Sequence, residues 1–303
     1  MVAELYIVAE SFANNSDNTT TEIETKTKSL ANDFVFIRKY SDTNKLFVHP
    51  DIYNIYFLRG VLLSDLLYNE TIANQHLDRD VRISLKKIII ESAITSNTSG
   101  EVIEVLLPIH NPDICHGLIA FNPIVGVDPS FQIVYHLQGW FDFRRYYLGL
   151  YPHDARFYID ECIKYFPKLF FHENTRITVG ALLNNCSRKI VYHLSALNDK
   201  FNSFDKRGMN RTQVLTTFSI LALLDETASL EGNAARKKYF TFEFMNHENV
   251  MEPVCCEPHL KLCHNDNYPG DNAYVTNRRI YFHEGKTNIH EGKILIGHIG
   301  THL

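Results

Sequence analysis

The sequence predicts an α+β protein, with an N-terminal mixed α/β region, central helices and a C-terminal antiparallel β-sheet. Short apolar runs typical of strands come first, helical periodicity dominates the middle, and polar–apolar alternation returns in the last fifty residues. Strands, then helices, then strands again are typical of α+β proteins rather than of a regular βαβ alternation. We therefore divide the chain into three predicted regions, 1–98, 99–210 and 211–303.

The N-terminal region supplies the first strands. The apolar run 5–9 predicts a buried strand, and the polar, Thr/Asn-rich stretch 14–21 predicts a loop or a helix cap. The alternation in 34–40 predicts a second strand, and 45–49 continues the sheet. Apolar residues at helical spacing predict a helix over 78–92.

The central region is predicted to be mainly helical. The turn-rich segment 95–100 separates it from the first region. Asp154 is a suitable N-cap for a helix that ends before Pro167. Further helices are predicted at 178–185, 189–201 and 212–232, and a strand at 239–244 leads into the C-terminal sheet.

Bulk composition limits the class of protein. The 303 residues carry a formal net charge of −5, so a nucleic-acid partner would have to meet a local basic patch rather than the whole surface. The six cysteines show no framework spacing, which predicts reduced thiols and a cytoplasmic protein. The N-terminal residues do not read as a signal peptide, and no apolar run is long enough to span a membrane. We therefore expect no membrane partner.

The C-terminal fifty residues hold the most informative pattern. Three strands are predicted, at 256–262, 279–283 and 293–303. Because side chains alternate between the two faces of a strand, one face of the sheet should carry a row of polar groups. That row consists of Glu257, His259 and Lys261 on the first strand and of Arg279, Tyr281 and His283 on the second. We expect such a face to be accessible, either solvated or forming a site.

These residue types suit phosphodiester cleavage without a metal or any other cofactor. Such cleavage needs a base, an acid and cations that stabilise the charge growing on phosphate oxygens. His259 and His283 are the candidate acid–base pair, and Lys261 and Arg279 are the candidate phosphate clamp. Tyr281 is assigned to a hydrogen bond or to base stacking, and Glu257 to orienting an imidazole or acting as the base. His298 completes the candidate set.

A purely structural interpretation stands beside this one. Solvated sheet faces often carry Lys, Arg and Glu as protection against strand pairing at an edge. His298 and His302 could serve only to bond backbone groups near the end of the sequence.

The tail also resembles a known group of nucleases. A helix at 212–232 followed by strands, the sequence Arg279-Ile280-Tyr281-Phe282, and the apolar strand 293–299 resemble the compact ribonuclease fold of RelE/ParE-type toxins and their barnase-like and EndoU-like relatives. The resemblance covers roughly the last ninety residues. It implies catalysis by Lys, Arg and Tyr, which would be Lys261, Arg279 and Tyr281. The many histidines depart from RelE and are more similar to the His-based members.

Two metal-dependent alternatives remain open. A PD-(D/E)xK nuclease needs a strand with Glu-x-Lys, and Glu257 with Lys261 has the wrong spacing. A zinc site could draw on the cluster formed by Cys255, Cys256, Cys263, His259 and His264, although adjacent cysteines point to opposite faces of a strand. Buried or half-buried thiols explain these cysteines more simply.

A second nucleic-acid contact is predicted in the centre of the chain. Arg144 and Arg145 beside Tyr147 could grip phosphate and stack bases. The alternative is that these aromatic side chains belong to the core and that the arginine stems cover them.

The function predicted from these patterns is that of an intracellular, metal-independent endoribonuclease. Its partner would be nucleic acid, RNA rather than DNA, and it would act as a toxin-like effector in prokaryotic defence, restrained by a protein partner or inhibitor. The alternative from a different class is a non-catalytic sensor or adaptor that uses the aromatic segment 131–201 for protein contacts. No phosphate-binding loop and no G-x-S-x-G motif is present.

Overall fold

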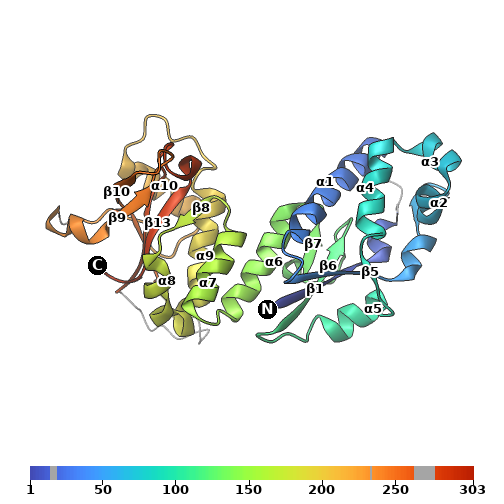
Figure 1. Ribbon diagram of the computed structural model, residues 1–303, viewed down its shortest axis with the longest axis horizontal. Coiled ribbons are helices and arrows are strands. Elements are labelled where there is room, and N and C mark those ends of the chain that lie inside the picture. The colour runs from blue at the N-terminus through green and yellow to red at the C-terminus, as the bar shows by residue number, and fades with distance from the viewer. Residues whose placement is uncertain (14–18, 233, 263–276) are drawn as a thin grey trace. The chain divides into compact units, whose positions relative to one another are not determined.

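The computed structural model describes residues 1–13, 19–232, 234–262 and 277–303, and the chain divides into two compact units. Unit 1 is Met1–Arg144 and unit 2 is Arg145–Leu303. The predicted fold class is confirmed: a parallel sheet with helices comes first, helices follow, and a mostly antiparallel sheet closes the chain (Figure 1). The division of the chain into three regions, with boundaries at 98/99 and 210/211, stays a prediction.

Unit 1 is built on a five-stranded parallel sheet in the order β5-β2-β1-β6-β7. The central strand β1 is buried along most of its length, as its apolar sequence predicts. The strands expected near 5–9 and 45–49 are confirmed as β1 and β2. The strand bounds are β1 (Val2–Ile7), β2 (Asn44–Val48), β5 (Ala93–Ile94), β6 (Ile114–Ala120) and β7 (Gln132–Val134).

The strand predicted at 34–40 is wrong, because this segment ends the long helix α1 (Thr20–Arg38). A capping box starts α1: Thr19 accepts from the Glu22 N–H, and Glu22 accepts in return from the Thr19 N–H. From there the apolar residues follow helical spacing, so that Phe34 is buried while its neighbour Val35 is 49% exposed. The local alternation was therefore part of a longer helical period.

Smaller elements complete unit 1. The predicted helix at 78–92 is confirmed as α4 (Arg79–Ile89), with Asp78 as its N-cap. The remaining elements are η1 (Ala9–Phe12), η2 (Pro50–Asn54), β3 (Tyr56–Leu58), β4 (Val61–Leu62), α2 (Leu63–Tyr68), α3 (Glu70–His76), α5 (Ser99–Glu101), η3 (Val102–Leu106) and η4 (Pro129–Phe131).

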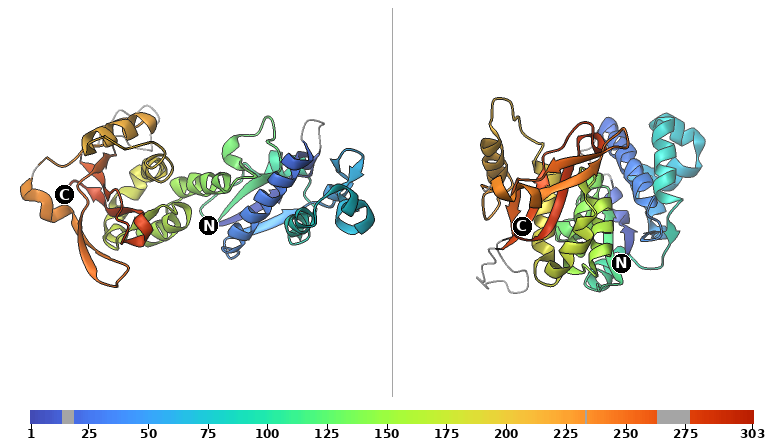
Figure 2. Two further views of the ribbon diagram at one scale, coloured as in Figure 1. Left: turned by 90° about the horizontal axis from the view of Figure 1, so that it is seen from above. Right: turned by 60° about the vertical axis from the view of Figure 1, so that its left-hand side comes forward.

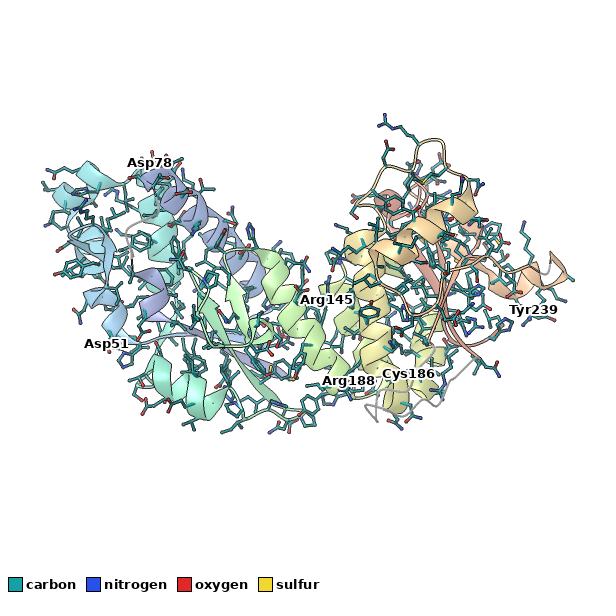
Figure 3. The ribbon with its side chains drawn as sticks, turned by 180° about the vertical axis from the view of Figure 1, so that it is seen from behind. Asp51, Asp78, Arg145, Cys186, Arg188 and Tyr239 are labelled. Atoms are coloured by element: carbon teal, nitrogen blue, oxygen red, sulfur yellow. The ribbon has the colours of Figure 1, made fainter. Side chains whose placement is uncertain are left out.

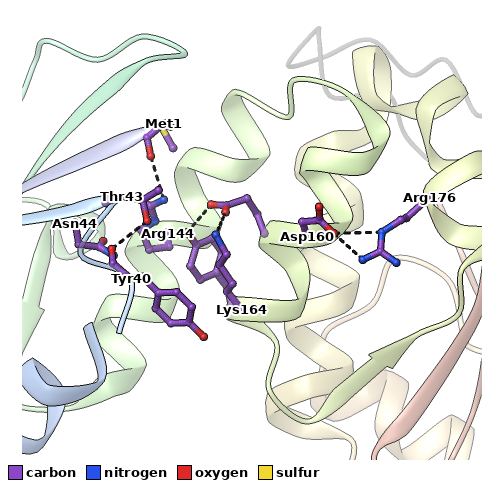
Figure 4. A network of polar contacts seen from close by, with 10 residues as sticks. Met1, Tyr40, Thr43, Asn44, Arg144, Asp160, Lys164 and Arg176 are labelled. Atoms are coloured by element: carbon purple, nitrogen blue, oxygen red, sulfur yellow. Dashed lines mark hydrogen bonds and ion pairs between the residues drawn. The ribbon is translucent and has the colours of Figure 1, made fainter. Parts of the chain in front are cut away.

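The predicted nucleic-acid platform at Arg144, Arg145 and Tyr147 is wrong. All three side chains are buried in α6 (Leu137–Leu150), with exposed fractions of 0%, 2% and 0%. Arg144 donates to the backbone oxygens of Met1 and Thr43 within unit 1 (Figure 4). Arg145 donates to Asp199 at 2.6 Å and to the backbone oxygen of Tyr165 within unit 2. The arginines satisfy buried backbone and carboxylate oxygens, so they cannot reach a nucleic acid.

Unit 2 contains a four-stranded sheet in the order β11-β12-β13-β8. Its strands are β8 (Leu169–Phe171), β11 (His259–Lys261), β12 (Arg278–His283) and β13 (Ile294–Thr301), and only β13 and β8 run parallel. The three predicted C-terminal strands are confirmed. The segment 263–276, which contains Cys263 and His264, lies outside the described residues.

Both faces of this sheet are covered. On one face Phe282 contacts Phe201 at the end of α9, with ring centres 5.6 Å apart. On the other face Tyr281 and Leu295 pack in one apolar cluster with residues of η6 (Ala234–Phe240) and of the hairpin β9 (Thr241–Met245)–β10 (Met251–Cys255). Figure 2 shows this hairpin, in orange, beside the red strands of the sheet.

The helices of unit 2 follow the predicted positions in part. The segments predicted as two helices, 178–185 and 189–201, form the short turn η5 (Val179–Leu182) and one continuous helix, α9 (Leu183–Lys200). Asp154 caps α7 by accepting from the Phe157 N–H, as predicted. The helix predicted over 212–232 ends at Leu221, because the chain turns at Leu223, which has a positive φ of 54°. The remaining elements are α7 (Ala155–Tyr165), α8 (Asn174–Thr178), η5 (Val179–Leu182), α9 (Leu183–Lys200), α10 (Arg211–Leu221) and η7 (His290–Gly292). Among the described helices, none is both long and apolar enough to cross a membrane.

Candidate active site

A row of ring side chains crosses the C-terminal sheet. Strand register places His259 opposite Tyr281, and Tyr281 opposite His298. Ring centres lie 5.2 Å apart between His259 and Tyr281 and 6.0 Å apart between Tyr281 and His298. One step along the strands, Lys261 pairs with Arg279. The prediction that His259, Lys261, Arg279 and Tyr281 share one face is confirmed, because antiparallel partners point to the same side of a sheet.

His283 lies in a different environment from this row. The register of β12 and β13 shifts between Tyr281 and Phe282, so that His283 faces Leu295. Its Nδ1 accepts from the backbone N–H of Gly285 at 3.0 Å. The adjoining Glu284 accepts two hydrogen bonds from Arg211, which also pairs with Glu257 at 3.1 Å. His259 and His283, predicted as one acid–base pair, thus hold separate sets of partners, and Glu257 belongs to the set around Arg211.

The expectation that the polar face is open is wrong for the row itself. The exposed fractions of His259, Tyr281 and His298 are 5%, 0% and 3%. Phe240 lies parallel over Tyr281, with ring centres 5.9 Å apart and an interplanar angle of 4°. The sequence pattern showed which residues share a face but did not show that η6 and the β9–β10 hairpin cover that face.

The two imidazoles of the row are neutral and fully bonded. His298 Nε2 donates to the Thr301 carbonyl at 2.9 Å, so Nδ1 is the acceptor for the Asn174 amide at 3.2 Å. His259 Nδ1 faces the Glu257 carbonyl at 3.4 Å, and Nε2 accepts from the Ser229 hydroxyl at 3.1 Å. Burial, reinforced by the charge of Arg279, lowers the pKa of His259 to about 4. Burial also lowers the pKa of His298. Both side chains therefore position groups around them rather than exchange protons near neutral pH.

The Tyr281 hydroxyl lies at the centre of the row and is sealed from solvent. Among the described residues it makes no side-chain hydrogen bond, and the backbone of Leu303 lies near it. Burial raises the pKa of Tyr281, and the nearby carboxylate of Glu231 acts in the same direction. The backbone of Leu303 and the guanidinium groups of Arg279 and Arg236 oppose these effects. A buried hydroxyl that lacks a side-chain partner is costly, so its presence requires an explanation, and a functional role is one such explanation.

The open edge of the site is formed by His302, which the strand pattern did not place among the catalytic candidates. Its ring centre lies 6.4 Å from that of Tyr281, and its side chain is 29% exposed. His302 Nε2 lies 3.3 Å from a carboxylate oxygen of Glu231, and Nδ1 lies 2.9 Å from Nη2 of Arg236. Because a guanidinium only donates, Nδ1 is the acceptor and the Nε2–H points to Glu231. A carboxylate, an imidazole and a guanidinium thus meet in one chain of contacts.

We name this group the Tyr281 cluster. It comprises Tyr281, His259, His298, His302, Glu231, Arg236 and Arg279. Two of its members, Glu231 and Arg236, come from the loop and short helix before β9, and the sequence signal that could have found them is the basic run Arg236-Lys237-Lys238 next to an aromatic pair. Lys237 and Lys238 are exposed, and Tyr239 is 55% exposed and points outward (Figure 3). Beside the cluster, Lys261 pairs with Glu226 at 3.3 Å.

Metal-binding alternatives find no geometric support in the described part of the chain. Within it, no three His, Cys, Asp or Glu side chains converge as ligands of one ion. Cys256 is buried and burial raises the pKa of its thiol, which opposes the thiolate form that zinc requires. Of the two metal-dependent interpretations, the zinc cluster also relied on Cys263 and His264, whose positions are not described.

Searches for similar proteins found no match among family models, curated proteins or solved structures. Functional inference therefore depends on the geometry of this chain alone.

Proposed function

We propose that unit 2 is a metal-independent nuclease that cleaves RNA at the Tyr281 cluster. The observation that carries this proposal is the position of His302, partly exposed between the Glu231 carboxylate and the Arg236 guanidinium at the edge of a buried row of aromatic rings. A carboxylate–imidazole pair next to a cation contains the groups that phosphodiester cleavage needs without a metal.

The mechanism begins with the exchange of one contact. In the free protein Arg236 donates to Nδ1 of His302, which blocks the lone pair. A phosphate of the substrate is a stronger, charged acceptor for this guanidinium. When Arg236 turns to the phosphate, Nδ1 becomes available to take a proton from the ribose 2′-hydroxyl. Glu231, which accepts the Nε2–H, then stabilises the imidazolium, as a carboxylate does in other His-based sites.

Bond formation and bond cleavage follow from this proton transfer. The 2′-oxygen attacks the phosphorus, the bond to the 5′-oxygen breaks, and the leaving oxygen takes a proton from solvent. The products are a 2′,3′-cyclic phosphate and a 5′-hydroxyl. Because the attacking group is the 2′-hydroxyl, the mechanism selects RNA over DNA. Arg279 adds a second positive charge beside the row, while His259 and His298 hold the floor of the site in place.

Cleavage of labelled RNA by the purified protein in excess EDTA tests this function. We expect His302→Gln and Arg236→Gln each to lower the cleavage rate at least 100-fold, since general base catalysis contributes about 10²–10⁴. His76→Gln is the matched control, because His76 is an exposed histidine at the end of α3 in unit 1. Full activity of both variants would overturn the assignment, and Mg²⁺-dependent cleavage of DNA would favour a carboxylate nuclease instead.

A toxin-like effector role in prokaryotic defence is part of the same proposal. Such a nuclease would arrest growth when expressed alone and would need a protein inhibitor. Expression of the wild type should therefore stop growth in a bacterial host, and His302→Gln should relieve the arrest at equal protein level. Growth arrest that persists undiminished in His302→Gln would separate toxicity from this site. Most of the large aromatic side chains in 131–201 are buried, and this supports the nuclease proposal over an adaptor that would use them for protein contacts.

A further inference from the structure

A second concave site lies in unit 2, at the turn of the β9–β10 hairpin. It has a volume of about 450 Å³, which is within the range of small-ligand pockets. Its walls come from two segments that are far apart in sequence. The hairpin contributes Met245, Asn246, His247 and Asn249, and the turn before β13 contributes His290, Glu291 and Lys293.

The backbone around this pocket is strained. In the described part of the chain five non-glycine residues have a positive φ, and three of them line the pocket: Asn249 (60°), His290 (44°) and Glu291 (59°). For His290 and Glu291 such conformations cost on the order of 1 kcal/mol each, whereas Asn tolerates them; they persist where the surrounding structure enforces them, often at ligand sites. The clustering of these three backbone conformations is an observation separate from the shape of the pocket, and both observations single out the same part of unit 2.

One wall of the pocket carries a stacked pair of flat rings. The imidazole of His290 lies on the ring of Phe170, with ring centres 3.5 Å apart and an interplanar angle of 14°. One face of the imidazole is therefore covered, while the residue itself still lines the pocket. A planar ligand would extend this stack, and nucleobases stack on His and aromatic side chains in single-stranded RNA recognition.

The polar side chains that line the pocket could bind the remaining parts of a nucleotide, the edge of the base and the phosphate. The side chains of Asn249 and Glu291 are both exposed, and they offer an amide and a carboxylate to hydrogen-bond the edge of a base. Lys293 supplies one cation for a phosphate. The turn leads directly into β13, and His302, at the open edge of the Tyr281 cluster, follows Lys293 by nine residues, or roughly 30 Å along the extended chain. A single RNA strand several nucleotides long would therefore be needed to occupy both the pocket and the edge of the cluster.

We propose that this pocket binds a nucleotide of single-stranded RNA, with the base stacked on His290 and the phosphate beside Lys293. This inference rests on the proposed function of the Tyr281 cluster, for which the pocket would be a recognition subsite.

The test is binding of AMP, GMP, CMP and UMP to the full-length protein, followed by ligand-observed saturation-transfer NMR in EDTA. We expect saturable binding of at least one nucleotide, weakened 10-fold or more by His290→Asn and by Lys293→Gln. Asn tolerates the left-handed backbone, so His290→Asn removes the ring without adding strain. His153→Asn is the matched control, because His153 also has a positive φ (52°) and contacts an aromatic ring, that of Phe157, outside the pocket.

The outcomes separate the two proposals. No saturable binding of any of the four nucleotides, or equal binding by wild type and both pocket variants, overturns the subsite. Nucleotide binding that survives in His302→Gln and is lost in the pocket variants supports it. If wild type binds in this way but cleaves no RNA in EDTA, the nuclease proposal fails while the nucleotide pocket stands.

Discussion

Each unit places a row of polar side chains across its central strands, and the two rows differ in what stands at the centre. In unit 1 the centre is a carboxylate: Glu4 lies between Lys45 and His116, at 3.9 Å and 3.6 Å, and accepts from the Tyr6 hydroxyl at 3.0 Å. In unit 2 the centre is the phenol of Tyr281, between two neutral imidazoles.

The difference separates a structural network from a candidate site. The row of unit 1 contains its own counter-charge: Glu4 accepts from Tyr6 and lies close to Lys45 and His116, although Nδ1 of His116 makes no hydrogen bond within the described residues. The row of unit 2 itself carries no acidic side chain. Within the described residues, the Tyr281 hydroxyl makes no hydrogen bond to another side chain, and the row approaches a carboxylate at its edge, where Glu231 lies beside His302. An unsatisfied row is less stable than a paired one, and this is where we place the chemistry.

The largest difference between the two units should appear in how their stability changes when the pH is lowered. In unit 2 burial lowers the pKa of both His193 and His259 to about 4, from an ordinary value of 6.5. Between these values the unfolded chain binds more protons, so stability falls as the pH falls. Each imidazole should lower the free energy of unfolding by about 2 kcal/mol between pH 7.5 and pH 5.

Unit 1 should respond in the opposite direction. Burial raises the pKa of Asp33 to about 7, from 3.8, so the native state binds the extra proton and stability rises as the pH falls. The lowered pKa of His116 offsets part of this gain. Hydrogen exchange at pH 5 and pH 7.5, corrected for intrinsic rates, should show lost protection in unit 2 and retained protection in unit 1. Equal loss in both units would contradict the comparison.

Removing the central acid of unit 1 should have the next largest effect. Glu4→Ala should lower the free energy of unfolding by about 2 kcal/mol, because Tyr6 and His116 lose their shared partner. Lys45→Ala is the control and should change it by less than about 0.5 kcal/mol, since this lysine is 56% exposed. Urea denaturation gives both values, and equal effects would show that Glu4 does not organise the row.

Removing the hydroxyl of Tyr6 and removing that of Tyr281 should change the free energy of unfolding in opposite directions. Tyr6→Phe removes a hydroxyl that donates to Glu4 and should cost about 1 kcal/mol. Tyr281→Phe removes a buried hydroxyl that makes no side-chain hydrogen bond within the described residues, so stability should stay unchanged or rise by up to about 1 kcal/mol. Thermal unfolding of the two variants would measure this. Destabilisation by Tyr281→Phe as large as that by Tyr6→Phe would show that the Tyr281 hydroxyl is bonded in solution.

The smallest effect on stability should come from His302, the residue to which we assign the central role in the proposed cleavage. His302 is partly exposed, so His302→Gln should change the free energy of unfolding by less than about 0.5 kcal/mol while removing RNA cleavage. Denaturation and cleavage measured on the same preparation would show whether the two losses are separate. A variant that loses activity only in proportion to its lost stability would point to a structural role.

The sequence determined the C-terminal strands and the residues that share a face, because a strand has a fixed period of two that can be read from alternation alone. It also determined the cap of α7, since an N-cap bonds a backbone group only two or three residues away. The mistaken strand at 34–40 shows the limit of this reasoning, because a short alternation can lie inside a longer helical period.

Only the tertiary structure decided which of these groups are buried and which of them meet. Burial of Tyr281 depends on Phe240, and the contacts of His302 depend on Glu231 and Arg236, all of which are at least forty residues earlier in the chain. No pattern in the local sequence predicts these contacts, because they result from the packing of η6 and the β9–β10 hairpin on the sheet. Because of this packing, we place the candidate site at His302, at the edge of the row, rather than at the predicted pair His259 and His283.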